Sequence, residues 1–139
     1  MTYEDKLKEL NITLPEAKAP VGNYVATKIS GKLLFVSGQI SIDEDGQLIK
    51  GKVGKDLNTE AGYYAAKRCA LSIIAQVKSA CNNDLSKVKS CIKLTGFVNS
   101  TEDYTDQPKV INGASDLIAS VFGDAGMHTR AAVSTNSLP

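Results

Sequence analysis

The strongest constraint on the fold is an amphipathic pattern in the middle of the chain, over residues 58–80. Apolar residues recur there every four positions, at Ala61, Ala65, Cys69, Ile73 and Val77, and Ala66, Ala70 and Ile74 widen the stripe. Asn58 or Thr59 can cap the first turn, and Asn82-Asn83-Asp84 offer side chains that compete for backbone hydrogen bonds at the other end. The pattern predicts a long helix that ends near Ala80, with its apolar face covered by a sheet.

Shorter β-forming runs surround this helix. Residues 24–29 and 33–37 are joined by Ser30-Gly31, which is typical of a hairpin, and a later turn should give Gly46 a positive φ. Residues 88–98 alternate apolar and polar side chains as a strand does. Asp106 and Pro108 then start a second helix that Gly123 ends, and residues 129–135 form a last strand.

This order of elements predicts an α+β fold with two main helices packed on one face of a mixed β-sheet. The strand–helix–strand passage implies parallel pairing and a right-handed crossover. Thr2 and Asp5 have the spacing of a capped first turn, so a short N-terminal helix and an irregular connector should occupy residues 1–20. The 139 residues fit a single domain, 1–139.

Composition excludes several classes of protein. The formal net charge is +1, and we interpret the two loose groups of lysines (50, 52 and 55; 87, 89 and 93) as solvated surface, so no nucleic-acid partner is expected. No apolar run approaches the length of a membrane span, and the first residues do not form a secretory signal, so we expect a cytoplasmic protein. Three cysteines without C-x-x-C spacing and one histidine predict no metal site, and nothing implies a cofactor.

Several stretches together resemble the YjgF/RidA family, whose members hydrolyse reactive enamines and imines. In chain order, they are Val21-Gly22-Asn23-Tyr24-Val25, Phe35-Val36-Ser37-Gly38-Gln39-Ile40, Lys93-Leu94-Thr95-Gly96-Phe97-Val98, Val110-Ile111-Asn112, Thr129-Arg130-Ala131-Ala132-Val133 and Leu138-Pro139. The resemblance covers most of the chain after Pro20, and the additional N-terminal helix suggests a divergent branch. It implies a chorismate-mutase-like fold, a homotrimer, and ligand clefts between neighbouring subunits.

The resemblance also implies a set of site residues. Arg130 matches the family arginine that binds the substrate carboxylate, and a guanidinium suits this role because it can form two parallel charge-assisted bonds with a carboxylate. Tyr24 matches a tyrosine that lines the cleft, Ser37 and Gly38 match a ligand-contacting turn, and Asn112 matches an asparagine near the site. Each of these also has an ordinary structural interpretation: a salt bridge for Arg130, a packed ring for Tyr24, a strand end at residues 37–38 and a surface amide for Asn112.

The sequence departs from the family pattern in two places. Ala132 stands where family enzymes often carry a cysteine, so only its backbone groups can contact a ligand. Family chains also continue beyond Leu-Pro into a strand with a glutamate that positions the hydrolytic water, whereas this sequence ends at Pro139. We expect that the strand lies beyond the printed residues, since its loss would expose a sheet edge. His128 adjoins Arg130 and is a candidate general base, with an exposed loop histidine as the alternative.

The leading hypothesis is hydrolytic deamination of small 2-imino or 2-enamino acids, such as 2-aminoacrylate, to 2-keto acids and ammonia. Arg130 would hold the carboxylate, while backbone groups around residues 37–38 and 131–132 would orient the imine. The alternatives are a non-enzymatic module that binds small carboxylate metabolites, and an endoribonuclease or translation inhibitor. The absence of a basic surface or an aromatic platform in the sequence argues against RNA as the substrate.

Overall fold

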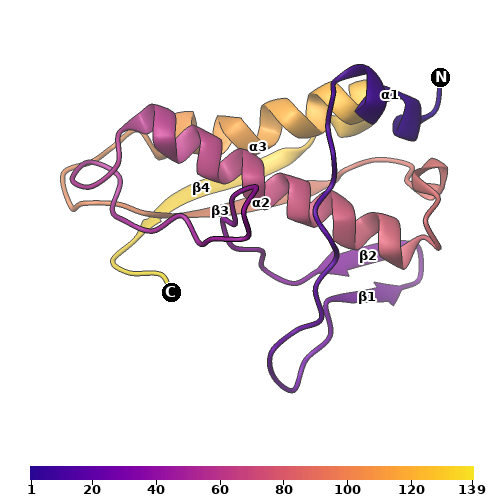
Figure 1. The fold of residues 1–139 in the computed structure, drawn as a ribbon, viewed down its shortest axis with the longest axis horizontal. Helices are drawn as coiled ribbons and strands as arrows, with labels where there is room; N and C mark the ends of the chain where they lie inside the picture. Colours follow the sequence, from indigo (N-terminus) through magenta and orange to yellow (C-terminus); the bar gives the residue numbers. More distant parts are fainter.

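A computed structural model describes all residues from Met1 to Pro139. Three α-helices, two short 3-10 helices and four strands follow one another along the chain (Figure 1). They are α1 (Tyr3–Glu9), β1 (Thr27–Ser30), β2 (Leu33–Val36), α2 (Thr59–Ala80), η1 (Leu85–Lys87), β3 (Lys93–Asn99), α3 (Gln107–Phe122), η2 (Gly123–Gly126) and β4 (Thr129–Thr135). The predicted α+β fold class and order of elements are confirmed.

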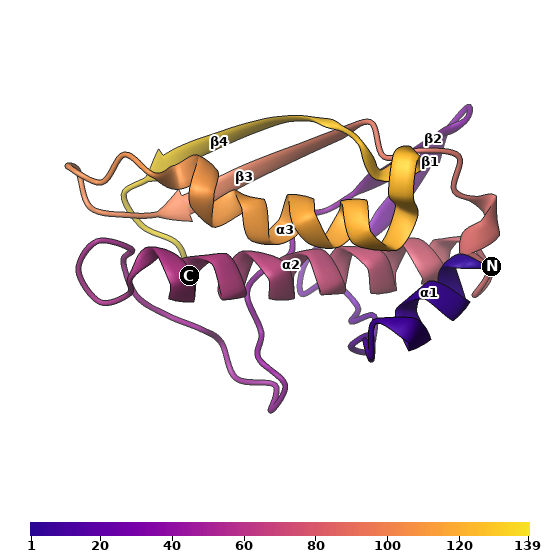
Figure 2. The ribbon, with the colours of Figure 1, turned by 90° about the horizontal axis from the view of Figure 1, so that it is seen from above.

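The strands form two separate pairs on one side of the helices. β1 and β2 are antiparallel, with Thr27 opposite Val36, and β3 and β4 are parallel, with Lys93 opposite Thr129. Figure 2 shows α2 and α3 side by side and running in the same direction, with β3 and β4 along α3. The parallel pairing predicted from the strand–helix–strand order is therefore present, although the mixed sheet appears as two pairs without a shared ladder.

The most buried row of α2 packs against α3. It consists of Gly62, Ala66, Ala70 and Ile74, and the last three belong to the part that widens the predicted stripe. The centre of that stripe, from Ala61 to Val77, is only half-buried. A Cβ atom at Gly113 of α3 would lie 1.9 Å from the carbonyl oxygen of Tyr63, so the two backbones are close enough to exclude any side chain there. The prediction of a sheet as the main cover of α2 was wrong, because small residues allow a second helix to take that place.

Local chemistry fixes the helix ends much as the sequence predicts. The Asn58 side chain accepts a hydrogen bond from the backbone of Ala61 at 2.8 Å. Asn82 and Asn83 adopt left-handed conformations directly after α2, and Gly123, at φ 59°, ends α3. The strand predicted from Val88 begins later, at Lys93, because η1 and a short extended segment occupy the preceding residues.

The N-terminal helix is docked on the rest of the chain. Thr2 and Asp5 form a capping box, and Leu7 is buried in the main apolar cluster. The ring of Tyr3 contacts Phe122 edge to face, with 4.8 Å between ring centroids. The Glu4 carboxylate accepts a hydrogen bond of 2.7 Å from the backbone N–H of Leu85, so α1 contacts both α3 and η1.

The strand face turned away from the helices carries exposed apolar side chains. Phe97 on β3 and Val133 on β4 are opposite each other in the register and are 59% and 44% exposed. Leu33 and Phe35, which share one face of the β1–β2 hairpin, are exposed as well, and so is Ile29 on its other face. Exposed apolar side chains that are neighbours, as Phe97 and Val133 are, are typical of an interaction site. No helix is long and apolar enough to cross a membrane.

Candidate functional site

Arg130 lies near the start of β4, on the side of the strand that faces α3. Residues alternate along β4, so Arg130 and Ala132 are half-buried toward the helix while Thr129 and Ala131 are exposed. The guanidinium donates from Nη1 to the Ser115 hydroxyl at 3.1 Å and from Nη2 to the carbonyl oxygen of Pro108 at 3.2 Å. These two contacts with α3 hold its orientation.

The positive charge of Arg130 has no carboxylate partner in the chain. The three ion pairs join Lys6 to Glu9, Arg68 to Glu44, and Lys109 to Asp106. A guanidinium has five N–H donors, and only two of those of Arg130 are used by α3. The remaining donors and the unpaired charge suit an anion, since a partly desolvated cation is stabilised by a charged acceptor. The salt-bridge interpretation of Arg130 is therefore not supported.

Asn112 and Ala132 lie near Arg130. Pro108, Asn112 and Ser115 follow the helical spacing that puts side chains on one face of α3, so Asn112 shares the face that contacts Arg130. Ala132 is two residues further along β4, on the same side of the strand as the arginine. The structure therefore brings three of the predicted site residues together.

The outer edge of β4 adds backbone hydrogen-bonding groups beside the arginine. The N–H of Thr129 donates to Ile92 and the carbonyl of Thr135 accepts from Ser100, so alternate residues beginning with Thr129 point toward β3. The backbone N–H and C=O groups of Arg130 and Ala132 consequently point to the opposite edge, where no strand pairs with β4. A ligand held by the guanidinium could meet both kinds of group.

His128 is connected to Arg130 through Ser115. Its Nε2 atom lies 2.8 Å from the Ser115 hydroxyl, and its Nδ1 atom lies 2.6 Å from the carbonyl oxygen of Gly126. Both ring nitrogens are therefore occupied, which argues against the general-base hypothesis and against a freely exposed histidine. Ser115 was not among the site residues predicted from the sequence, although its position three residues after Asn112 on one helix face was a usable signal.

Tyr24, Ser37 and Gly38 form a second group, on the β1–β2 hairpin. Ser37 donates its hydroxyl to the carbonyl oxygen of Val25 at 2.6 Å and its backbone N–H to that of Ala26 at 2.9 Å. Tyr24 is exposed, and a Cβ atom at Gly38 would meet nothing within 4 Å. The hairpin does not pair with β3 or β4, so the chain by itself presents two separate groups of predicted site residues.

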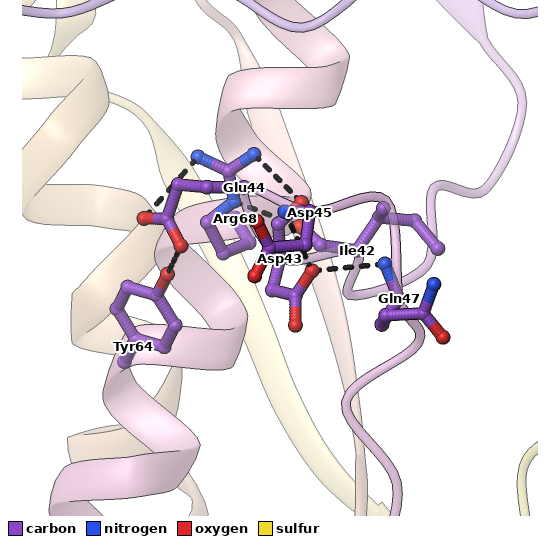
Figure 3. Close-up of polar contacts among 7 residues, drawn as sticks. All are labelled: Ile42, Asp43, Glu44, Asp45, Gln47, Tyr64 and Arg68. Carbon is purple, nitrogen blue, oxygen red and sulfur yellow. Dashed lines mark hydrogen bonds and ion pairs between the residues drawn. The ribbon is translucent and has the colours of Figure 1, made fainter.

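Arg68 of α2 provides a contrast with Arg130, because its polar groups are satisfied within the chain (Figure 3). It is only 8% exposed and donates from Nε to the carbonyl oxygen of Ile42 at 2.7 Å. Nη1 lies 3.9 Å from the Glu44 carboxylate, which also accepts a 2.5 Å hydrogen bond from Tyr64. That hydrogen bond lowers the pKa of Glu44 and raises the pKa of Tyr64. Arg68 thus fastens the 42–47 turn to α2.

The cysteines show no sign of a redox or metal centre. All three are free thiols, and no cluster of three or more histidine, cysteine or acidic residues could hold a metal ion. Burial raises the pKa of Cys69 to about 11 and also raises that of Cys91. Such thiols are poor nucleophiles near neutral pH.

Comparison with known proteins identifies the family of the chain. Residues 4–139 match the family model described as "YjgF/chorismate_mutase-like, putative endoribonuclease". The chain belongs to the YjgF/RidA family. The Trypanosoma cruzi protein TCP17 is 46% identical over 134 residues, which are 96% of this chain and 83% of that relative.

Two solved structures are similar over nearly the whole chain. Atu1372 from Agrobacterium tumefaciens, a protein of unknown function, is 49% identical with a TM-score of 0.90, and the match covers 99% of this chain and 85% of that one. A "putative endoribonuclease" from Shewanella oneidensis is 36% identical with a TM-score of 0.95, over 100% and 91% of the two chains. The fold expected from the family resemblance is therefore confirmed.

Proposed function

We propose that this protein hydrolyses small 2-imino or 2-enamino acids to 2-keto acids and ammonia, with the substrate carboxylate bound by Arg130. The observation that carries the proposal is the guanidinium itself, which is oriented by α3 and has no carboxylate partner in its own chain. Family membership supports the same chemistry, because the YjgF/RidA resemblance implies imine and enamine hydrolysis with an arginine in this position.

The reaction needs little machinery beyond orientation. A water oxygen attacks the electrophilic imine carbon, the C–N bond breaks, and the nitrogen leaves as ammonia with the protons that water supplied. The free N–H groups of Arg130 would bind the carboxylate, and the edge backbone groups of Arg130 and Ala132 would orient the imine or the water. An oriented electrophile can gain much of its acceleration from proximity alone.

A second copy of the chain would complete the site. We propose a homotrimer in which Tyr24, Ser37 and Gly38 of one copy approach Arg130 of another, because these groups lie on different strand pairs within one chain. The exposed apolar side chains of β3, β4 and the hairpin, including Phe97 and Val133, give such an assembly a surface to bury. Sedimentation velocity measures the oligomeric state directly.

The proposal is tested with imino acid generated in the assay by an amino-acid oxidase with catalase. Wild-type protein should accelerate the release of ammonia, and Arg130→Lys should lower kcat/KM at least about tenfold, because a lysine cannot form the paired bonds with a carboxylate. Lys109→Ala is the matched control, since Lys109 is an exposed cation of α3 whose only ion pair is with Asp106. Equal loss in both variants, or no acceleration by the wild type, would contradict the proposal.

A non-enzymatic carboxylate-binding module is the second candidate. It is favoured by the occupied ring nitrogens of His128, which leave no free base beside Arg130. Saturable binding of a 2-keto acid that Arg130→Ala abolishes, without any acceleration of imine hydrolysis, would identify this function. The ribonuclease description attached to some relatives predicts a different result, namely RNA affinity that falls steeply with salt concentration.

A further inference from the structure

A chain of hydrogen bonds runs from Arg130 to the backbone of η2. Nη1 of Arg130 lies 3.1 Å from the Ser115 hydroxyl, which lies 2.8 Å from Nε2 of His128. Nδ1 of His128 lies 2.6 Å from the carbonyl oxygen of Gly126. The three residues come from β4, α3 and the segment between η2 and β4, so the chain ties the candidate ligand-binding side chain to two other elements.

The partners assign a direction to each bond. A carbonyl oxygen can only accept, so Nδ1 of His128 carries a hydrogen and donates it to Gly126. The guanidinium can only donate, so the Ser115 oxygen accepts from Arg130 and can give its own hydrogen to Nε2 of His128. Each of the three hydrogen bonds therefore joins a donor to an acceptor. The Ser115 hydroxyl and both ring nitrogens of His128 are satisfied without a further partner.

The hydrogen-bonded residues are held at two backbone positions, the carbonyl of Gly126 and the carbonyl of Pro108. Gly126 is buried, and a Cβ atom there would lie 2.5 Å from the carbonyl oxygen of Ile118, so its position is fixed by close contact with α3. The other guanidinium nitrogen, Nη2, donates to Pro108 in the first turn of α3. Two separated anchors limit rotation of the guanidinium, because a change in its side-chain torsions would break at least one bond.

We infer that Ser115 and His128 are positioning residues, which set the orientation in which Arg130 presents its free N–H groups to a carboxylate. This inference rests on the proposed carboxylate site. An arginine side chain has many rotamers, and ordering them upon binding weakens affinity, whereas a guanidinium held beforehand loses less. Ser115 acts directly on the guanidinium, and His128 acts through Ser115, since it has no hydrogen bond to Arg130.

The experiment measures pyruvate binding by isothermal titration calorimetry, which requires no turnover. Ser115→Ala should weaken binding about three- to tenfold, the usual range for loss of one hydrogen bond. Ser115→Thr, which retains a hydroxyl, should restore binding to within about twofold. Ser120→Ala is the matched control, because Ser120 is an exposed serine of the same helix and should leave pyruvate affinity unchanged.

The same substitutions made in an Arg130→Lys protein distinguish a positioning effect on the guanidinium from general damage to the fold. In Arg130→Lys protein, which keeps a cation without the guanidinium fork, Ser115→Ala and His128→Phe should change pyruvate affinity by less than about twofold. An equal effect of Ser115→Ala with arginine or lysine at position 130 would overturn the inference and leave the carboxylate site intact. If the wild type binds no pyruvate, or binds it independently of Arg130, the site itself is wrong and the inference falls with it.

Discussion

Replacing Gly113 with alanine should force α2 and α3 apart. The new Cβ atom would lie 1.9 Å from the carbonyl oxygen of Tyr63 and 2.8 Å from its carbonyl carbon. Cβ atoms essentially never approach another heavy atom within 3.0 Å, so the helices must separate locally by about 1.1 Å or deform. No rotamer change can relieve the contact, because both atoms of Tyr63 belong to the backbone.

The expected cost follows from two opposing effects. Overpacking a well-packed interior costs about 1–3 kcal/mol and occasionally more, and a clash of this depth between backbones belongs at the upper end. Alanine is favoured over glycine within a helix by about 1 kcal/mol. The net loss should be about 2 kcal/mol, which lowers Tm by about 6–8 °C for a chain of this length.

Urea unfolding followed by circular dichroism at 222 nm measures this loss, with wild type and variant at the same protein concentration because assembly affects apparent stability. Ser120→Ala is the control for an ordinary substitution on the same helix, and it should change stability by no more than about 0.5 kcal/mol. A Gly113→Ala protein as stable as the wild type would refute the close approach of the two helices.

Two further predictions concern titrating groups. Cys69, with its pKa near 11, should resist iodoacetamide at pH 8 in the native protein and react after unfolding; rapid native labelling measured by peptide mass spectrometry would contradict its burial. Tyr64 lowers the pKa of Glu44 in the folded chain, so this contribution to stability is full above the ordinary pKa of 4.5 and is lost as pH falls through the lowered value. The stability difference between wild type and Tyr64→Phe, measured by urea unfolding, should therefore shrink below about pH 4.5; a constant difference down to pH 3 would argue against this pair.

Local sequence signals predicted helix ends and the last strand well, because the residues that determine them are close together in the sequence. Asn58 caps the helix that it precedes, and Gly123 adopts the positive φ that ends α3. The partner of α2 was harder to predict. Periodicity shows that a face is buried but does not identify its cover, and the small residues of α2 accept a helix as readily as a sheet. The pairing of β3 with β4 is also non-local, since all of α3 separates the two strands in the sequence, whereas β1 and β2 are joined by a short local turn.

In the candidate site, too, features that depend on local sequence were predicted, and those that depend on distant residues were not. Arg130 and Asn112 were identified from their motifs, whereas Ser115 looks like an ordinary helix serine until the fold brings His128 and Arg130 to its two sides. His128 was identified from its residue type, but its partners could not be, because Gly126 and Ser115 contact it only after η2 and β4 turn back along α3. The sequence did not indicate the role of Arg68, because its hydrogen bonds are with the backbone carbonyls of Ile42 and Asp43, which every residue type provides.

The contact between Glu4 and Leu85 joins residues 81 positions apart through a single backbone proton. That proton can exchange with solvent deuterium only when the Glu4 carboxylate moves away or η1 opens. The Leu85 amide is therefore a built-in reporter of whether the N-terminal helix is docked, and it can be followed residue by residue without attaching a probe to the chain.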